Sequence, residues 1–293
     1  MFKRSILLLL LIGLVLTGCN ITRPTPVPGA TLIPGRGALK IAFLDVGQGD
    51  SILIQAPNGQ TMLIDGGRST DLANTVIIPK LREWGAKQVD VLIPTHPDAD
   101  HIGGLVGVLE SFPVKLAALT GQVHTTQIYE RLLMAIRDKS IPALQVRTGT
   151  VIPFDAAVKV EVLGPDDEAV QGDDNNNASI VIKLTYGNTS FLLTGDAESR
   201  ENKAMLEHGF DVRSNVLKLG HHGSRTSTNE DWLQRTQPQL GIISAGQDNS
   251  FGHPHPEVIA ALEKLKIQYI RTDEHGTITV TTDGMTLQVT STK

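Results

Sequence analysis

The stretch T-H-P-D-A-D-H-I-G-G, residues 95–104, decides how this chain folds and where its chemistry lies. Two histidines and two aspartates fall within six positions, although the whole sequence has only nine histidines. The stretch follows the apolar run V-D-V-L-I, residues 89–93, which predicts a buried strand. A loop at the end of such a strand can aim several imidazole and carboxylate groups at one divalent ion. The candidate metal ligands here are His96, Asp98, Asp100 and His101.

The glycine pair that closes the stretch predicts a close contact. Gly103 and Gly104 have no side chain beyond Cα, so the backbone of the helix that follows can approach another segment closely. A surface loop rich in histidine and aspartate is often only solvated, so a metal site needs further ligands elsewhere in the chain.

Two more apolar runs end in the same residue types. Residues 191–195 lead into Asp196, and residues 216–220 lead into the pair His221 and His222. Taken alone, Asp196 is typical of a helix N-cap, and a histidine pair is often purely structural. Three such strand ends in one chain favour a shared metal centre, and we add all three residues to the candidate ligands.

The first nineteen residues are typical of a secretion signal. Lys3 and Arg4 precede eleven mostly apolar residues, 6–16, which are too few to span roughly 30 Å of hydrocarbon. Cys19 is the only cysteine and follows small residues, where a bacterial lipoprotein signal places the thiol that receives lipid. We therefore predict a lipoprotein signal peptide over residues 1–19, lipidation at Cys19, and anchoring at the extracytoplasmic face of the cell membrane. Plain secretion and an uncleaved anchor helix are the alternatives.

Residues 20–38 predict an extended tether, because four prolines interrupt any helix or strand there. The remaining residues, 39–293, form the predicted folded domain. Removing residues 1–19 takes away two positive charges and no negative ones, so the balance becomes 24 minus 31, or −7. This charge argues against broad electrostatic capture of nucleic acid, although a local basic groove is compatible with it. Without cysteine, the domain has neither a disulfide framework nor a thiolate metal site.

Strands and helices interleave along the domain. Apolar runs bounded by turn residues predict strands at 40–44, 51–55, 61–64, 89–93, 114–119, 143–146, 158–163, 179–186, 190–194, 216–219, 240–244, 268–271, 277–280 and 286–289. Helical periodicity predicts helices at 72–84 with a kink at Pro79, and at 102–109, 127–137, 197–207 and 256–265. Because hairpins join many strands, two sheets in one α/β domain with helices outside fit better than a doubly wound parallel sheet.

The glycine-rich stretch D-V-G-Q-G-D-S, residues 45–51, is not a nucleotide-binding loop, because it lacks the Lys-Ser/Thr ending and the following helix. We therefore predict no nucleotide cofactor. Its glycines suit a tight turn beside the metal ligands. Gln48 and Asp50 are candidates to hold the histidines in place, and a purely structural turn is the alternative.

The chain resembles the metallo-beta-lactamase fold hydrolases, and within them the extracellular beta-lactamase-like domain of ComEC-type DNA-internalisation competence proteins. The resemblance runs from about residue 39 to residue 289 and rests on F-L-D-V-G-Q-G-D-S (43–51), D-G-G (65–67), T-H-P-D-A-D-H-I-G-G (95–104), L-T-G-D (193–196), H-H-G-S (221–224) and G-H-P-H-P (252–256). It implies a four-layer αββα sandwich of two mixed sheets, with metals at the edge between the sheets. It also implies that Asp65 supports the metal loop. No other stretch resembles a competence protein's membrane channel, so a transport role is not implied.

The sequence departs from the general family pattern at two ligands. Asp98 stands where most members have the second histidine of the His-x-His-x-Asp-His motif, and the region 175–179, with Asn177, replaces the third-motif histidine. The second site, matched by Asp100, His101 and one of the later histidines with Asp196 bridging, is complete. We therefore expect one firm site and one weaker site, holding one or two divalent ions. Oxygen-rich ligation favours manganese or magnesium, and zinc is also compatible.

The implied reaction is hydrolysis of a phosphodiester by a metal-activated water that Asp196 bridges or orients, with Asp100 as a further candidate catalytic residue. His253 is placed to donate to a phosphoryl oxygen, whereas His255 suits a cap for the helix at Pro256. Ser224 is a candidate phosphate contact, with a structural turn as the alternative. The leading prediction is a surface nuclease or phosphodiesterase, with DNA among its candidate substrates. The alternatives are a phosphorylcholine esterase or a lactonase on the same site, and a metal-binding module without catalysis. The natural substrate and the oligomeric state stay open.

Overall fold

Strand β1 (Leu39–Phe43) shows how the sequence pattern builds the layers. Leu39, Ile41 and Phe43 pack into the core between the two sheets, whereas Ala42 packs on the opposite face against the outer helices. Side chains of a strand alternate between its faces, so a mostly apolar run such as this one, interrupted only by the half-buried Lys40, is covered on both sides. The computed structural model describes residues 37–293. The predicted signal peptide, Cys19 and nearly all of the predicted tether lie outside these residues.

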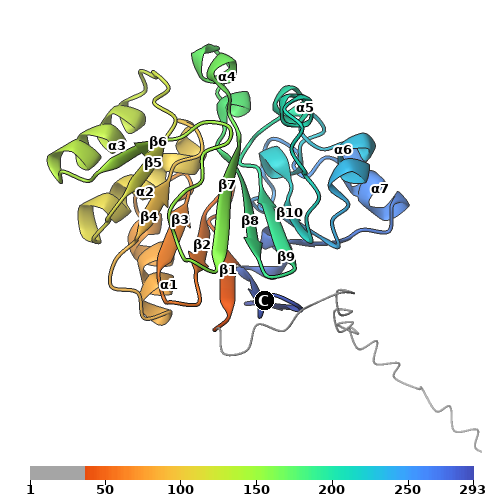
Figure 1. The fold of residues 1–293 in the computed structure, drawn as a ribbon, viewed down its shortest axis with the longest axis horizontal. Helices are drawn as coiled ribbons and strands as arrows, with labels where there is room; N and C mark the ends of the chain where they lie inside the picture. Colours follow the sequence, from red (N-terminus) through yellow and green to blue (C-terminus); the bar gives the residue numbers. More distant parts are fainter. Residues whose placement is uncertain (1–36) are drawn as a thin grey trace, which may run out of the picture.

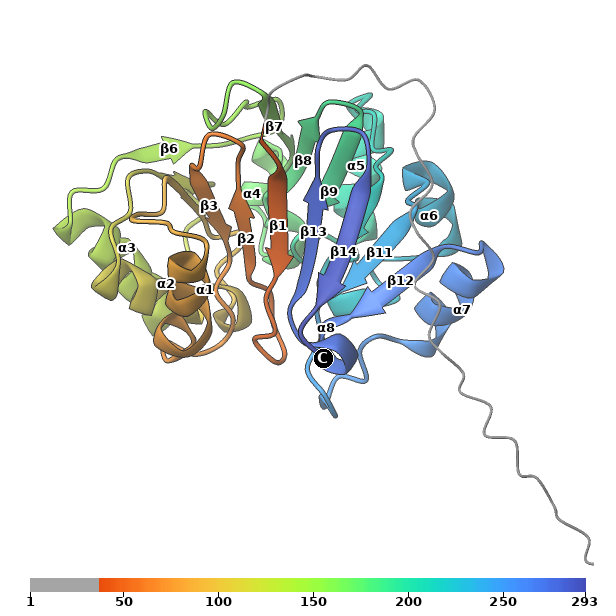
Figure 2. The ribbon, with the colours of Figure 1, turned by 90° about the horizontal axis from the view of Figure 1, so that it is seen from below.

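The first sheet has eight strands in the order β14-β13-β1-β2-β3-β4-β5-β6. After β1 these are β2 (Ile52–Gln55), β3 (Thr61–Ile64), β4 (Val91–Ile93), β5 (Ala117–Leu119), β6 (Ala143–Gln145), β13 (Ile278–Thr282) and β14 (Leu287–Ser291). Pairing is antiparallel from β14 to β3 and parallel from β3 to β6. Figure 2 shows that the last two strands of the chain lie beside β1, which opens the domain.

The second sheet has six strands in the order β12-β11-β10-β9-β8-β7. Their bounds are β7 (Val158–Gly164), β8 (Val181–Tyr186), β9 (Thr189–Leu193), β10 (Val216–Lys218), β11 (Leu240–Ile243) and β12 (Gln268–Arg271). Pairing is antiparallel from β7 to β9 and parallel from β9 to β12. Both sheets are therefore mixed, as predicted.

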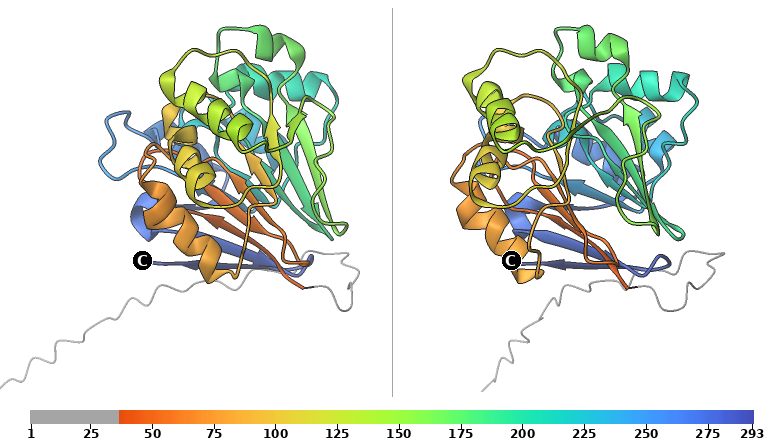
Figure 3. Two further views of the ribbon diagram at one scale, coloured as in Figure 1. Left: turned by 90° about the vertical axis from the view of Figure 1, so that its left-hand side faces the viewer. Right: turned by 60° about the vertical axis from the view of Figure 1, so that its left-hand side comes forward.

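Helices cover the outer faces of both sheets (Figure 1). On the first sheet lie η1 (Ala73–Ile77), α1 (Ile78–Glu83), α2 (Ala99–Ser111) and α3 (Gln127–Asp138). On the second lie α5 (Ser199–Glu207), α6 (Glu230–Thr236) and α7 (Pro256–Lys264). Short elements α4 (Asp167–Gln171), η2 (Asn176–Ala178), η3 (Gly220–Gly223) and α8 (Thr272–His275) sit in the loops. The layers stack as helices, sheet, sheet and helices (Figure 3), which confirms the predicted four-layer αββα sandwich.

The five long predicted helices and the predicted strands are present, with ends that shift by a few residues. The segment predicted as a helix kinked at Pro79 is a π-helical turn, η1, followed by α1 with that proline in its first turn. Helix α6 was missed, although Asn229 accepts a hydrogen bond from Trp232 N at 2.9 Å and so caps its start.

The glycine pair does bring two backbones together. A Cβ on Gly103 would lie 2.0 Å from the carbonyl oxygen of Arg68, and one on Gly104 would lie 2.0 Å from that of Gly66. Helix α2 therefore packs its first turns directly on the loop that follows β3, and this contact fixes the loop carrying His96 and His101 against Asp65.

We expect Gly104→Ala to destabilise the fold by at least about 3 kcal/mol, at the upper end of overpacking costs, because the atom it meets is backbone and cannot rotate away. Urea unfolding followed by circular dichroism measures the loss. Gly172→Ala is the matched control, since its nearest neighbour would be at an ordinary 3.4 Å. Equal stability of the two variants would contradict the packing argument.

Helix α5 contains a buried carboxyl group. Glu201 is 2% exposed and lies against Gly164 at the end of β7. Burial, with the negative charge of Asp166 nearby, raises the pKa of Glu201 to about 8. The folded protein therefore keeps this carboxyl protonated at neutral pH, while the unfolded chain ionises it near its ordinary pKa.

We expect Glu201→Gln to be more stable than the wild type at pH 8 and equally stable at pH 4. Between the ordinary pKa and about 8 only the unfolded state loses the proton, so the wild type loses stability as pH rises through this window. Each pKa unit corresponds to about 1.4 kcal/mol, so the difference amounts to several kcal/mol. Thermal unfolding from pH 4 to 9 measures it, with exposed Glu207→Gln on the same helix as the control. Parallel pH profiles would refute it.

Within residues 37–293, no helix has the length and apolar character needed to cross a bilayer.

Candidate metal centre

The predicted ligands follow the carboxyl ends of two pairs of parallel strands, one pair in each sheet. Asp65 follows β3 and the 95–104 stretch follows β4, while Asp196 follows β9 and the histidine pair follows β10. Parallel neighbours end at the same edge of a sheet, and the two sheets pack face to face, so these four loops meet. The site lies at the edge between the sheets, as predicted.

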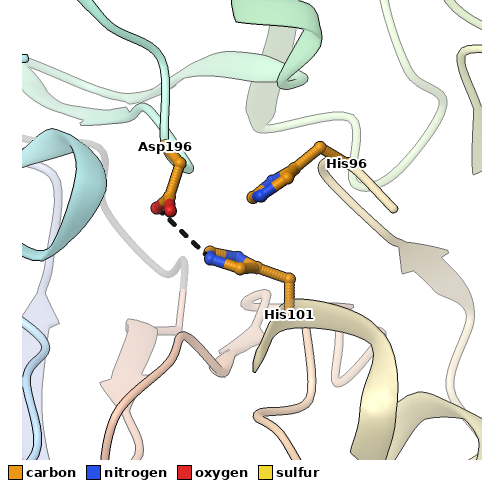
Figure 4. Close-up of side chains that lie close together, drawn as sticks. All are labelled: His96, His101 and Asp196. Carbon is orange, nitrogen blue, oxygen red and sulfur yellow. Dashed lines mark ion pairs between the residues drawn. The ribbon is translucent and has the colours of Figure 1, made fainter. Parts of the chain in front are cut away.

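The predicted ligands His96, Asp100, His101, Asp196 and His222 form a cluster, and Asp196 lies at its middle. Its Oδ1 is 3.2 Å from His101 Nε2, and its Oδ2 is 3.5 Å from His222 Nε2. Figure 4 shows His96 and His101 pointing toward this carboxylate from the other sheet. The ligand atoms of His96, His101 and Asp196 all lie within 4.8 Å of one another. The same spacing holds for Asp100, His101 and His222.

His101 is held by the carboxylate predicted to support it. Its Nδ1 donates to Asp65 Oδ2 at 2.8 Å. Asp65 also accepts from the backbone N–H and the hydroxyl of Thr95, at 2.8 and 2.7 Å. Because a carboxylate only accepts, the proton of the neutral His101 ring lies on Nδ1, and Nε2 faces the cluster with a free lone pair.

The other two histidines of the cluster share this tautomer. Nδ1 of His222 donates to the carbonyl oxygen of Ser244 at 3.0 Å. Nδ1 of His96 donates to the Thr95 hydroxyl at 3.0 Å, because that hydroxyl has given its own proton to Asp65. All three Nε2 atoms and Asp196 Oδ1 are buried without a hydrogen-bond partner among the described residues. Buried polar atoms are normally paired, so these four converging atoms fit a cation.

The charges of the cluster fit a cation as well. Burial disfavours charge on His222, yet Asp196, Asp100 and Asp50 raise its pKa to about 9. Against the same effect of burial, Asp196 and Asp65 hold the pKa of His101 well above its ordinary value. Burial alone would raise the pKa of Asp196, but the neighbouring histidines hold it well below the ordinary range. The site therefore favours an added positive charge. A divalent ion bound by these side chains would supply that charge.

His222, rather than His221, belongs to the cluster. His222 is buried, and its Nε2 lies 3.5 Å from Asp100 Oδ2. His221 turns its Nδ1 to Glu198 Oε1 at 2.8 Å, and its Nε2 stays 3.8 Å from Asp196 Oδ2 at the partly exposed rim. The backbone φ angles of both residues are positive, 46° and 55°, which is uncommon for residues other than glycine. This backbone lets adjacent histidines face the same site.

Asp98 lies at the rim and belongs to no three-ligand cluster of the described residues. Its side chain is 40% exposed, its Oδ2 lies 3.7 Å from His96 Nε2, and its Oδ1 accepts from Asn175 Nδ2 at 2.8 Å. Because Asn175 occupies Oδ1, a metal-ligand role for Asp98 would fall to Oδ2, and this role stays a prediction.

Three of the predicted site residues bond structural partners, and for Gln48 and Ser224 a structural role was the stated alternative. Gln48 Oε1 accepts from Gly246 N at 3.1 Å, so it ties two loops together and holds no histidine. Ser224 Oγ is buried and bonds the Thr226 hydroxyl at 2.8 Å, which is the structural turn. Asn177 Oδ1 accepts from two backbone N–H groups at the start of α5, each at 3.1 Å, so its side chain caps that helix. Its neighbours Asn175 and Asn176 are the ones that contact site residues.

His253 does lie beside the cluster. Its ring centre is 5.2 Å from that of His221 and 6.1 Å from that of His222. Burial and these two histidines lower its pKa to about 4, so the ring is neutral at pH 7. A neutral imidazole carries one N–H that can donate. His255 occupies the cap position of α7 without a side-chain cap, and its Nδ1 accepts from Arg225 N at 3.1 Å.

Asp50 lies next to a histidine as predicted, with Oδ1 3.4 Å from His222 Nδ1. Sequence reasoning missed two charged partners of the histidines, Glu198 and Lys218. Lys218 is fully buried, with Nζ 2.7 Å from Asp50 Oδ2. A signal for it was present, since alternation in β10 places residue 218 on the same face as the core residue Val216.

The family model described as "Metallo-beta-lactamase superfamily" matches residues 44–247. Among curated proteins, the chain is 34% identical over 254 residues to ComE operon protein 3 of Bacillus subtilis (strain 168), covering 82% of this chain and 32% of that protein. It is 28% identical over 266 residues to competence protein ComA of Neisseria gonorrhoeae, covering 90% of this chain and 34% of that protein. The chain thus spans about a third of the length of these relatives.

Solved structures share the fold at low sequence identity. CmlA, a diiron beta-hydroxylase from Streptomyces venezuelae, superposes with a TM-score of 0.54 at 11% identity, covering 88% of this chain and 54% of CmlA. This similarity supports the arrangement of sheets and helices and carries no statement about the reaction.

Proposed function

The chain belongs to the metallo-beta-lactamase superfamily, and on that premise we propose that it is a metal-dependent phosphodiesterase, specifically a nuclease, held on the cell surface. Hydrolases of this fold are generally metal-dependent, and the predicted resemblance to ComEC-type competence proteins is confirmed by the matched relatives. The phosphodiester substrate, with DNA as one candidate, and the surface location are proposals.

One observation carries the metal-dependent part of the proposal. His96 in the loop after β4, His101 in α2 and His222 in η3 each donate a hydrogen bond from Nδ1, and each turns Nε2 toward the Asp196 carboxylate without a hydrogen-bond partner among the described residues. A packed core would leave such atoms unpaired only at a cost of about 1–3 kcal/mol each. The atoms available to bind the metal are three imidazole nitrogens and the carboxylate oxygens of Asp100 and Asp196. This mixed set suits zinc or manganese, with magnesium as the weaker fit.

Each residue has a defined task in the proposed reaction. A divalent cation, when bound, lowers the pKa of its water and polarises the scissile group. Asp65 and Thr95 hold His101 and His96 in the binding tautomer. Asp100 and Asp196 compensate the ion's charge and accept hydrogen bonds. Neutral His253, on the rim, donates to a phosphoryl oxygen as negative charge develops there.

The choice of a phosphodiester is supported by the name of one relative, competence protein ComA, and by the rim of the site. The ring centre of His253 lies 5.2 Å from that of His221 at this rim, and a neutral His253 offers one N–H to a phosphoryl oxygen. The net negative charge of the chain argues for a small local contact with the substrate rather than a long nucleic-acid groove.

We also propose that lipid on Cys19 anchors the protein at the extracytoplasmic face of the cell membrane, with the proline-rich residues 20–38 as a spacer. The composition of the first nineteen residues supports this part. Globomycin sensitivity and metabolic labelling with a fatty acid test it in a bacterial host, with Cys19→Ala as the control.

The substrate proposal is tested by incubating the purified protein, with Mn²⁺ or Zn²⁺, with bis-p-nitrophenyl phosphate, single-stranded and double-stranded DNA, and p-nitrophenyl phosphorylcholine. Metal-dependent cleavage of the diesters and of DNA supports a nuclease. Preferred cleavage of the phosphorylcholine ester identifies the esterase instead, and metal binding without any turnover identifies a silent binding module. Asp138→Ala, an exposed aspartate on α3, is the control for loss of carboxylate charge alone.

A further inference from the structure

A fully buried lysine stands behind the metal centre. Lys218 is the last residue of β10 and is 0% exposed. Val216 packs between the sheets and Leu217 packs on the outer face, so the alternation of the strand directs Lys218 into the space between the sheets. An apolar side chain is expected at such a position, and an ammonium group is buried there only if it is paired.

The partner of this lysine is Asp50, in the loop between β1 and β2. Lys218 Nζ lies 2.7 Å from Asp50 Oδ2 and donates to the carbonyl oxygen of Leu219 at 2.9 Å. Asp50 is 1% exposed. The ion pair therefore joins a loop of the first sheet to a strand of the second, directly beneath the edge where the ligands meet.

Asp50 connects this ion pair to two candidate ligands. Its Oδ1 lies 3.4 Å from His222 Nδ1, the nitrogen that carries the proton. Its backbone N–H donates to the carbonyl oxygen of Asp100 at 3.2 Å. Moving Asp50 would therefore shift the ring of His222 and the loop that carries Asp100.

Asp50 also lies close enough to compete for the ion. A carboxylate oxygen of Asp50 is within 4.8 Å of ligand atoms of both Asp196 and His222. Without a neighbouring cation, this buried carboxylate would turn toward whatever positive charge the site contains. The ammonium of Lys218 already neutralises it, which leaves Asp50 free to face the Nδ1 side of His222.

We propose that Lys218 is a positioning residue for the metal centre: its buried ammonium holds Asp50 against His222 Nδ1, so that Nε2 faces the ion and Asp50 stays out of the coordination shell. This inference rests on the proposed metal centre and is independent of the substrate. Groups that orient metal-binding histidines typically contribute 10–100-fold to metal affinity.

The test measures Mn²⁺ affinity by isothermal titration calorimetry, and unfolding free energy by urea titration, for the unsubstituted full chain and four variants. Lys218→Met and Asp50→Asn should each bind Mn²⁺ about 10–100-fold more weakly. Each single variant should also lose stability, because it leaves one buried partner of the ion pair without the other. Lys183→Met is the matched control, since Lys183 is a largely buried lysine of the same sheet with Asp211 as its partner, and its Mn²⁺ affinity should not change.

The double variant Lys218→Met with Asp50→Asn separates positioning from a merely structural role. It leaves no unpaired charge, so it should recover most of the lost stability while its Mn²⁺ affinity stays weak. This variant also serves if either single variant fails to fold. Wild-type affinity in folded Lys218→Met, or recovery of both affinity and stability in the double variant, overturns the inference. Absence of Mn²⁺ binding by the wild type would instead overturn the metal centre itself, and this inference with it.

Discussion

Replacing Asp196 by alanine is expected to lower kcat/KM for bis-p-nitrophenyl phosphate by more than the roughly 100-fold that loss of an orienting group costs. Asp196 lies within 3.8 Å of His101, His221 and His222, and it is the carboxylate that the two halves of the cluster share. Its removal leaves the three Nε2 atoms without their common anionic partner. Steady-state kinetics with saturating Mn²⁺ measures the loss.

Two comparisons make this result specific. Asp196→Asn keeps the size of the side chain but removes its charge, and it should lose nearly as much activity as the alanine variant. Asp138→Ala removes an exposed carboxylate far from the cluster and should keep wild-type kinetics. Wild-type turnover in a folded Asp196→Ala protein would mean that hydrolysis does not use this cluster.

Removing the metal is expected to abolish turnover and to lower the thermal unfolding temperature, and adding Mn²⁺ or Zn²⁺ should restore both. A ligand at about 100 times its Kd stabilises the folded state by about 2.7 kcal/mol, because it binds the folded protein only. The effect should be large here, since the buried Nε2 atoms of the three histidines and Asp196 Oδ1 make no hydrogen bond within the described residues. Dialysis against a chelator, followed by differential scanning fluorimetry and the diester assay, measures it.

The Asp196→Ala protein provides the control for this experiment. Its unfolding temperature should hardly respond to added Mn²⁺, whereas that of the Gly172→Ala protein should respond as the wild type does. If metal-free protein, verified by elemental analysis, keeps full activity and an unchanged unfolding temperature, the cluster is a structural feature without a cation.

The two sheets and their covering helices could be predicted because each strand and helix has a pattern in its own stretch of sequence. Apolar runs separated by turn residues predicted the strands, and the hairpins predicted two sheets, as at 181–186 and 189–193. Strand order was not predictable in this way. The pairing of β1 with β13 joins Ile41 to Val280, and no local pattern encodes a contact over such a separation. Short helices such as α6 were missed because a single turn or two gives little periodicity.

The ligands of the site were predictable because they share a position, the end of an apolar run. That rule identified Asp196 and the histidines that the structure brings together, whereas the family resemblance added Asp65. It did not distinguish His221 from His222, because their roles depend on two positive φ angles and on Glu198. Gln48, Ser224 and Asn177 were assigned to the site from their motifs rather than from this rule, and their side chains bond backbone and hydroxyl groups. The direction in which a side chain points depends on tertiary packing, which the local sequence pattern does not specify.

The last two strands of the domain, β13 and β14, complete the first sheet beside β1. The first sheet therefore cannot form completely until these residues have been synthesised. Until residues 278–291 leave the ribosome, β1 has a partner on one side only, because β13 supplies the other. An unpaired strand edge is a template for association with other chains, and pairing across the full length of a sequence is slow. We therefore expect a fragment truncated before β13 to leave one edge of β1 unpaired and to aggregate more readily than the full chain.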